Sequence, residues 1–301
     1  MNRRGFLATT LAIPGTLAAA DGSHENARLR FGLITDAQYA DAEPKGERHY
    51  RATPEKLKAA VADLATRKLP FTLHLGDFID HDFKSFATML PLLEPLGHPV
   101  FHLLGNHDYD LTDAEKSRVV QTLDMPHDYY TFRRNGVRFL MLDTNALSVY
   151  KHPSGSPGNL VGKASLEKLT QAKQPGAQPY NGGIDDMQFA WMDRELRAAT
   201  AAGDIVLVCA HHPLLPAAAE QMWNPQPVLE LLLKYPCVKA WLNGHNHAGA
   251  YELHEGLHCV TFRSILHQPE TNAWSTVTVH DDRLIIEGHG REVSRDLPFR
   301  S

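Results

Sequence analysis

The sequence predicts an α/β protein in which short buried strands alternate with helices. Several brief apolar runs, typical of strands buried on both faces, are separated by segments with helical periodicity. Five of these runs end in a cluster of polar residues, which is the usual position of functional groups in layered α/β folds. The predicted strands cover residues 29–34, 71–75, 100–104, 137–142, 205–210 and 238–242.

Two helices and a hairpin support this assignment. In residues 54–68, Leu57, Val61 and Leu64 recur at helical spacing, and Asp185 with Gln188 predicts the capped start of a second helix over residues 185–199. Residues 276–286 alternate in polarity around an Asp-Asp turn and predict a hairpin. The protein is therefore expected to combine helices with sheets of mixed direction.

Residues 29–301 contain no repeat or linker and predict a single domain. Within it, residues 148–183 are rich in Pro, Gly, Lys and Gln and predict a long excursion that could rim a pocket.

The first twenty residues predict an export signal. Two adjacent arginines at positions 3 and 4, an apolar stretch over 6–17 and small residues at 18–20 are typical of a secretory signal peptide. The start resembles the bacterial twin-arginine signal, so we expect passage through the twin-arginine export machinery to the periplasm. The stretch is short for a membrane span. Cleavage after Ala20 or retention as an anchor both stay open.

Composition narrows the possible partners and cofactors. The 301 residues carry 30 basic and 35 acidic side chains, so no basic field is available to hold a nucleic-acid polymer. Eighteen histidines stand beside three scattered cysteines, which argues against a disulfide framework and against thiolate metal sites. Any bound metal is therefore expected to have nitrogen and oxygen ligands.

Polar clusters follow five of the predicted strands, and their loops should converge at one edge of the fold. Each cluster alone is a weak signal, but together they supply nitrogen and oxygen donors suited to Mn, Fe, Zn or similar divalent ions. The clusters are Asp36-Ala37-Gln38, Gly76-Asp77, Gly105-Asn106-His107-Asp108, Ala210-His211-His212-Pro213 and Gly244-His245-Asn246-His247.

This ordered set resembles the calcineurin-like metallophosphoesterase superfamily from about Phe31 to the C-terminus. A tighter similarity is visible to the manganese-dependent ADP-ribose/CDP-alcohol diphosphatases, in which Gln38 replaces a more common histidine. Further matches to that group are Arg48-His49-Tyr50-Arg51, Asn181-Gly182-Gly183 and Gly288-His289-Gly290-Arg291. The resemblance implies a four-layer αββα sandwich of two mixed sheets flanked by helices, with two divalent metal ions, Mn the first expectation and Fe, Zn or Mg alternatives.

The resemblance also implies the metal ligands. One metal is expected to lie among Asp36, Gln38, Asp77 and His247, with Asp77 shared between the two ions. The second metal would be completed by Asn106, His211 and His245.

His107 matches the family's substrate-facing histidine, which could stabilise the leaving oxygen or donate a proton. Asp108 is expected to orient it. His107 could instead only support the metal ligands. His212 could line the pocket or pack below Pro213.

Three residues are candidates for substrate binding. Tyr39 matches an aromatic position that stacks on the nucleobase in the diphosphatases, although it could simply pack at the sheet edge. Arg48 and Arg51 could bind the second phosphate, although loop arginines are more often only solvated.

The implied function is hydrolysis of the diphosphate bond in nucleoside diphosphate derivatives such as ADP-ribose and CDP-choline, by attack of a metal-bridging hydroxide. Two alternatives stay open. One is a phosphodiesterase acting on cyclic nucleotides or glycerophosphodiesters, and the other is an exported metal- or nucleotide-binding protein with little turnover.

Overall fold

The computed structural model describes residues 26–300. The predicted export signal at residues 1–20 lies outside them and stays a prediction.

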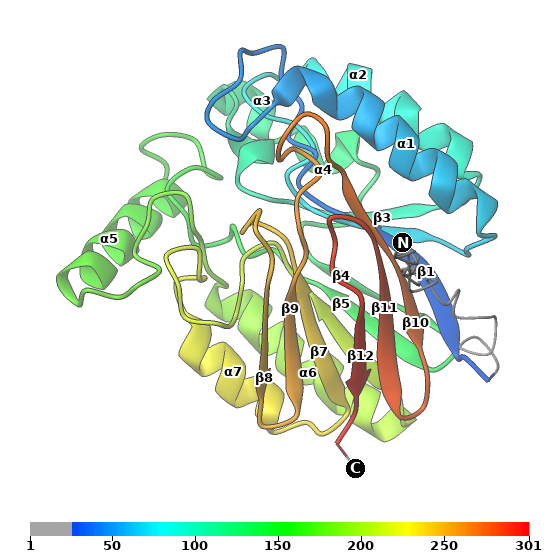
Figure 1. Cartoon of the computed structure of the whole chain (residues 1–301). Helices are drawn as coiled ribbons and strands as arrows, with labels where there is room; N and C mark the ends of the chain where they lie inside the picture. Colours follow the sequence, from blue (N-terminus) through cyan, green and yellow to red (C-terminus); the bar gives the residue numbers. More distant parts are fainter. Residues whose placement is uncertain (1–25, 301) are drawn as a thin grey trace, which may run out of the picture.

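Two six-stranded mixed sheets form the centre of the fold (Figure 1). The first has the order β12-β11-β10-β1-β2-β3, with β1, β2 and β3 parallel and the remaining pairs antiparallel. Its strands are β1 (Leu29–Ile34), β2 (Thr72–Leu75), β3 (Val100–Leu103), β10 (Ala273–Val279), β11 (Arg283–Gly290) and β12 (Arg295–Pro298).

The second sheet has the order β4-β5-β6-β7-β9-β8, and β5, β6, β7 and β9 run parallel. The outer strands β4 and β8 pair antiparallel with their neighbours. The strands are β4 (Tyr130–Arg134), β5 (Val137–Met141), β6 (Ile205–Cys209), β7 (Val238–Asn243), β8 (Ala250–His254) and β9 (Leu257–Thr261).

Helices cover the outer faces of the two sheets (Figure 1). The first sheet is covered by α1 (Thr53–Thr66), α2 (Ser85–Met89) and the 3-10 segment η3 (Leu90–Leu96). The second is covered by α6 (Asp186–Ala202) and α7 (Pro225–Leu233), while α5 (Pro157–Gln171) projects from the body. The remaining helical segments are short: η2 (Tyr50–Ala52), η4 (His107–Tyr109), α3 (Asp113–Lys116) and α4 (Val119–Thr122).

Side-chain alternation along the second sheet creates two separate cores. In β6, Leu207 and Cys209 pack between the two sheets, whereas Val206 and Val208 pack against the helical layer that contains α6 and α7. A strand buried on both faces must be apolar at successive positions, which is why β6 has no polar alternation. The four-layer αββα sandwich is thereby confirmed.

Helix α1 packs closely on β1 because Gly32 has no side chain. A Cβ at Gly32 would lie 2.6 Å from Thr72 Oγ1 and 3.2 Å from a methyl carbon of Leu64. Leu57, Val61 and Leu64 are all buried, as the predicted helical periodicity requires.

The start of α6 is capped by Asp185, whose side chain accepts a hydrogen bond from the backbone N–H of Gln188 at 2.8 Å. The Gln188 side chain does not complete a capping box. It accepts from the Asp143 N–H and donates to the Asp143 carbonyl, both at 2.8 Å, which ties α6 to the end of β5.

Four strands were not predicted from the sequence: β4, β8, β9 and β12. Strand β8 alternates between half-buried and exposed positions and lies at a sheet edge, so it has no continuous apolar run. The predicted excursion at 148–183 is present and contains α5. The hairpin is also present and longer than predicted, pairing Val279 with Leu284 next to its turn.

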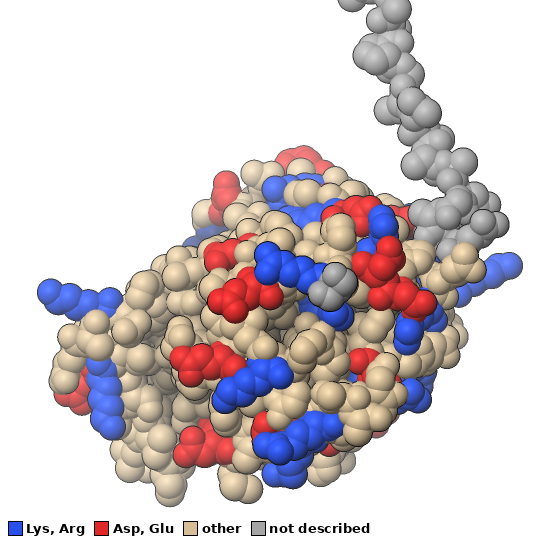
Figure 2. Space-filling view, turned by 90° about the horizontal axis from the view of Figure 1, so that it is seen from below, with Lys and Arg blue, Asp and Glu red and all other residues tan. Residues whose placement is uncertain are grey.

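The surface charge is mixed, as the composition predicts. Figure 2 shows Lys and Arg side chains interspersed with Asp and Glu on the face it presents. Among residues 26–300, no helix has both the length and the apolar character needed to cross a membrane.

A pair of buried histidines, His74 on β2 and His102 on β3, lies inside the first sheet with the two Nδ1 atoms 3.2 Å apart. Burial lowers the pKa of His102 to about 4 and holds that of His74 well below its usual range. Both rings are therefore neutral in the folded protein near pH 7.

We predict that this pair makes the metal-free protein sensitive to acid. The unfolded chain binds protons near the ordinary histidine pKa of 6.5, whereas folded His102 does so only near 4, so stability is lost as the pH falls between these values. Each histidine contributes at most about 1.4 kcal/mol per pH unit. Denaturant titrations at several pH values should show that the free energy of unfolding falls less steeply with decreasing pH in His102→Leu than in the exposed control His127→Leu. Equal pH dependence of the two variants would contradict this origin.

Candidate functional site

The polar clusters predicted from the sequence meet at one end of the two sheets. Loops after β1, β2, β3, β6 and β7 all contribute, because the parallel strands of each sheet end on the same side. Hydrogen bonds and close contacts join residues far apart in the chain, such as Gln38 with His247 and His211 with Asp77. The structure brings together Asp36, Gln38, Asp77, Asn106, His107, His211, His245 and His247.

Four of these residues have a left-handed backbone although none is glycine. The φ angles are 51° at Asp36, 43° at Gln38, 56° at Asp77 and 69° at His245. Such conformations cost free energy for a residue with a Cβ and are maintained only where the surrounding structure demands them. Here they turn the side chains just past the strands toward a common centre.

Two glycines allow the chains to approach this centre. A Cβ at Gly105 would lie 2.1 Å from Asp77 Oδ1, and one at Gly244 would lie 2.3 Å from Asp36 Oδ2. Neither position can carry a side chain without displacing a buried carboxylate.

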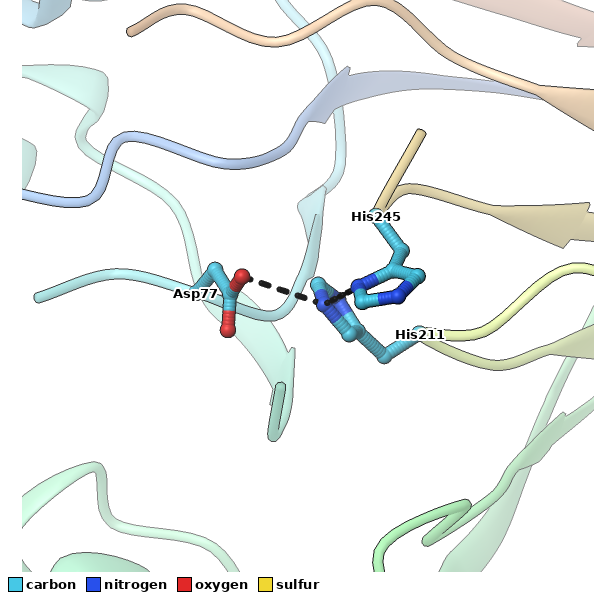
Figure 3. A group of neighbouring side chains, drawn as sticks. All are labelled: Asp77, His211 and His245. Carbon is cyan, nitrogen blue, oxygen red and sulfur yellow. Dashed lines mark hydrogen bonds and ion pairs between the residues drawn. The ribbon is translucent and has the colours of Figure 1, made fainter. Parts of the chain in front are cut away.

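Asp77, His211 and His245 form the centre, and their side chains point toward one another (Figure 3). His211 Nδ1 donates to the Leu75 carbonyl at 2.8 Å, so its Nε2 carries a lone pair that faces Asp77 Oδ2 at 3.1 Å. His245 Nε2 donates to Asn181 Oδ1 at 2.8 Å, so its Nδ1 lone pair faces His211 Nε2 at 3.2 Å. When His211 is unprotonated, the two ring nitrogens and the Asp77 carboxylate are three acceptors that face one another, an arrangement that a proton or a metal cation satisfies.

A second group lies beside the first. Asp36 Oδ1 is 3.6 Å from His247 Nε2, and the Gln38 amide bridges His247 and Asp77 at 3.1 and 2.7 Å. The Gln38 Nε2 atom faces these groups, so ligation through Oε1 requires a 180° turn of the amide.

Two buried amide oxygens in this region have no hydrogen-bond partner, Gln38 Oε1 and Asn106 Oδ1. A buried acceptor without a partner is costly, and a metal ion is one group that would satisfy it. Together with three imidazoles and two carboxylates, these oxygens form a donor set that fits first-row divalent ions.

The electrostatics of the centre depend on Asp77. Burial alone would raise its pKa, but the adjacent His211 and His107 hold the pKa of Asp77 well below its usual range. Burial likewise opposes protonation of His211, yet the charge of Asp77 outweighs it and raises the His211 pKa to about 9. The site thus attracts positive charge, whether a proton or a metal ion.

His107 lies next to this centre and is held by two partners that the metal group does not use. Arg48 Nη1 lies 3.2 Å from His107 Nε2, and since a guanidinium can only donate, Nε2 is the acceptor. The proton is therefore on Nδ1, which donates to Asp80 Oδ1 at 2.7 Å. Asp80 is fully buried and fixes the ring so that Nε2 faces Arg48 and the open cavity.

Asp108 does not contact the His107 ring, although it was expected to orient that ring. Its carboxylate accepts hydrogen bonds from the backbone N–H groups of Asp77, Phe78, Ile79 and Gly105, at 2.8 to 3.3 Å. Burial and the charge of Asp77 raise the pKa of Asp108, and these N–H donors oppose the rise. Asp108 therefore organises the loop that carries Asp77.

His212 packs against two candidate ligands, with its ring centroid 5.2 Å from that of His211 and 4.4 Å from that of His245. Burial and the neighbouring His211 lower its pKa to about 3, so the ring is neutral. Its Nδ1 bonds to Thr144 Oγ1 at 2.7 Å.

A cavity of about 390 Å³ opens over the centre. Arg48 lines it, whereas Tyr39 packs against the inter-sheet core and Arg51 pairs with Asp41 and Glu43 away from it. The substrate-binding roles of Tyr39 and Arg51 stay predictions. The cavity is lined by Gln38, Arg48, Asn106, His107, Tyr180, Glu220, His245, Asn246, His247, Ala248 and His267.

Several residues of the site were missed by sequence reasoning, chiefly Asp80, Asn181, Tyr180 and Glu220. Asp80 follows β2 three residues after Asp77, a signal that could have been used. Asn181 lies in the motif that supported the resemblance, but its bond to His245 depends on the tertiary fold.

We predict that the Asp77→Ala variant no longer retains a divalent metal ion. The substitution deletes the carboxylate that both ligand groups contact, whereas Asp41→Ala removes an exposed carboxylate from a nearby loop. After loading with Mn²⁺ and dialysis, metal analysis should find the wild-type stoichiometry in Asp41→Ala and almost none in Asp77→Ala. Normal metal content in Asp77→Ala would refute the site.

We further predict that Asn181 sets the strength of metal binding by orienting His245. Asn181→Leu removes the acceptor for His245 Nε2 and should weaken Mn²⁺ binding by about ten- to a hundredfold. Asn181→Asp keeps the acceptor for His245 but loses the Nδ2 donor to the Gly176 and Ala219 carbonyls, so it should retain more of the affinity than Asn181→Leu does. Calorimetric titration of both variants tests this, and equal affinities would exclude the orienting role.

Residues 29–249 match the family model described as calcineurin-like phosphoesterase. Similar proteins include the manganese-dependent ADP-ribose/CDP-alcohol diphosphatases of Xenopus tropicalis and Oryza sativa subsp. japonica. The first is 30% identical, covering 92% of this chain and 96% of the relative, and the second is 29% identical, covering 89% and 94%.

A solved dimetal phosphatase from Danio rerio has the same fold, with a TM-score of 0.80 and 24% identity over 91% of this chain and all of that structure. The family match covers well over half of the chain, including the strand-end clusters after β1, β2, β3, β6 and β7. The chain belongs to the calcineurin-like phosphoesterase family and is a metal-dependent phosphohydrolase.

Proposed function

We propose that this protein is a manganese-dependent hydrolase that cleaves the diphosphate bond of nucleoside diphosphate derivatives such as ADP-ribose and CDP-alcohols. The observation that carries the proposal is the convergence of the lone pairs of His211 and His245 on the Asp77 carboxylate, beneath an open cavity. The choice of substrate and of manganese rests on the diphosphatases to which the chain is similar over about nine-tenths of its length.

The two metal ions would be held as the sequence resemblance implies. Asp36, Gln38 and His247 would hold one, Asn106, His211 and His245 the other, and Asp77 both. Bound divalent ions lower the pKa of water and neutralise the charge on phosphate oxygens. The protein supplies the rest of the chemistry through residues that line the cavity.

His107 and Arg48 would act together on the substrate. A guanidinium binds a phosphate oxygen more strongly than a neutral imidazole, so Arg48 turns to the phosphate and frees His107 Nε2. Nε2 then faces the oxygen of the leaving phosphate, while Asp80 holds the opposite nitrogen. Burial opposes protonation of His107, but the charge of Asp77 and the hydrogen bond to Asp80 raise its pKa overall. With Arg48 turned away, the ring would take up a proton from water at Nε2, and this N–H would stabilise the leaving oxygen or protonate it.

Export through the twin-arginine machinery is also proposed, on the strength of residues 1–20 alone. N-terminal sequencing of the protein from the periplasmic fraction tests it, because a mature chain that still begins at Met1 would exclude cleavage.

A substrate panel tests the proposed reaction. With Mn²⁺, we expect ADP-ribose and CDP-choline to be hydrolysed in preference to cyclic AMP and bis(p-nitrophenyl) phosphate, with AMP and ribose 5-phosphate as products of the first. Preference for cyclic AMP would indicate a phosphodiesterase. Absence of any turnover by the metal-loaded protein would indicate a binding protein.

We predict that His107→Gln lowers kcat toward ADP-ribose by about 10²- to 10⁴-fold, because it removes the group that faces the leaving oxygen. Metal content should stay at the wild-type level, since His107 is not among the proposed ligands. The exposed His127→Gln is the matched control. A variant that retains full kcat would exclude a catalytic role for His107.

A further inference from the structure

The wall of the cavity has two flanks of opposite charge. In the described part of the chain, Arg48 and Glu220 are the residues on this wall with a permanent formal charge. Arg48 lies beside His107 at the phosphate end, whereas Glu220 lies with Tyr180 on the flank built by the segment after α5 and the loop between β6 and α7.

Glu220 opposes the binding of an anion unless another part of the substrate compensates for its charge. Across residues 26–300, its carboxylate makes no hydrogen bond or ion pair, although the side chain is only half-buried. Two negative groups in one cavity repel each other, so a carboxylate beside a phosphate site is costly. This cost is recovered only if the substrate brings a hydrogen-bond donor or a positive charge to Glu220.

Tyr180 provides an aromatic face beside this carboxylate. The residue is 39% exposed, its ring centroid is 5.8 Å from that of His245, and it lines the same cavity. Burial and the charge of Glu220 raise the pKa of the Tyr180 hydroxyl, which reflects the proximity of the two side chains. A planar ring stacked on Tyr180 would therefore lie close to His245 and in the same cavity as the Glu220 carboxylate.

This flank is rigidly assembled. Asn181 Nδ2 donates to the carbonyls of Gly176 and Ala219, at 2.9 and 2.7 Å, and so joins the neighbours of Tyr180 to those of Glu220. The backbone N–H of Trp223 donates to the Gly182 carbonyl at 2.8 Å. The same Asn181 accepts from His245, so the flank has a defined position relative to the metal centre.

An aromatic face with one hydrogen-bond acceptor at its edge is the chemistry that recognises a nucleobase carrying an amino group. We infer that Tyr180 and Glu220 form the nucleobase subsite of the proposed diphosphatase, and that Glu220 selects adenine and cytosine over hypoxanthine and uracil. This inference rests on the proposed function. Adenine and cytosine present an exocyclic amino donor to the carboxylate, whereas hypoxanthine and uracil present a carbonyl oxygen that the carboxylate repels.

The test compares ADP-ribose with inosine diphosphate ribose, in which the exocyclic amino group of the base is replaced by a carbonyl oxygen. It uses the full Mn²⁺-loaded enzyme. We expect wild-type kcat/KM to favour ADP-ribose by about ten- to a hundredfold. In Glu220→Gln this ratio should fall toward one, because a carboxamide offers both a donor and an acceptor. The control Glu230→Gln, on the exposed face of α7, should keep the wild-type ratio.

Aromatic stacking is tested separately. Tyr180→Leu should raise KM for ADP-ribose with a smaller change in kcat, and should raise KM more than Tyr39→Leu does. The opposite result would place the base on Tyr39 and overturn the inference, as would an unchanged substrate ratio in Glu220→Gln. Equal hydrolysis of both nucleotides by the wild type overturns only the subsite, whereas hydrolysis of bis(p-nitrophenyl) phosphate without either nucleotide overturns the proposed function as well.

Discussion

The structure depends on one electrostatic constraint, the burial of the Asp77 carboxylate among imidazole lone pairs that need a cation between them. The Leu75 carbonyl and Asn181 each take the outer N–H of one histidine, so that His211 and His245 turn their acceptors inward. Without positive charge at this point the arrangement is unfavourable, because three acceptors face one another away from water. The surrounding elements serve to hold it in place.

The backbone that carries these side chains is strained, and the two rigid sheets prevent it from relaxing. Asp36, Gln38, Asp77 and His245 have left-handed backbones immediately after their strands, and the Asp108 carboxylate ties the loop of Asp77 to backbone N–H groups. Strain of this kind persists only where rigid neighbours prevent relaxation. The apolar strands, buried between helices and the opposite sheet, supply that rigidity, and the glycines at 105 and 244 permit the close approach.

The cavity above this centre has two chemically different flanks. On one flank, the Arg48 guanidinium and the oriented His107 imidazole suit a phosphate. On the other flank, the Glu220 carboxylate and the Tyr180 ring suit a group that carries no negative charge. Asn181 links the second flank to the metal centre through His245 and through the carbonyls of Gly176 and Ala219. The proposed nucleobase subsite and the proposed metal ligand His245 are thus joined by the side chain of one buried residue, Asn181.

The sequence alone determined the αβ alternation and the chemistry of the ligand clusters, because apolar periodicity and strand-end Asp, Asn and His residues are local signals. It located β1, β2, β3, β5, β6, β7 and the hairpin of β10 and β11, but not β4, β8, β9 or β12. Edge strand β8, for example, alternates between half-buried and exposed residues and so lacks an apolar run. Only the tertiary structure decided the partners of each side chain. Asp80 rather than Asp108 orients His107, Arg51 turns away to Asp41 and Glu43, and Glu220 joins Tyr180 from a distant loop. Asp80 and His107, like Tyr180 and Glu220, are widely separated in the chain, and their relative positions follow from how the two sheets and their loops pack, which no local pattern encodes.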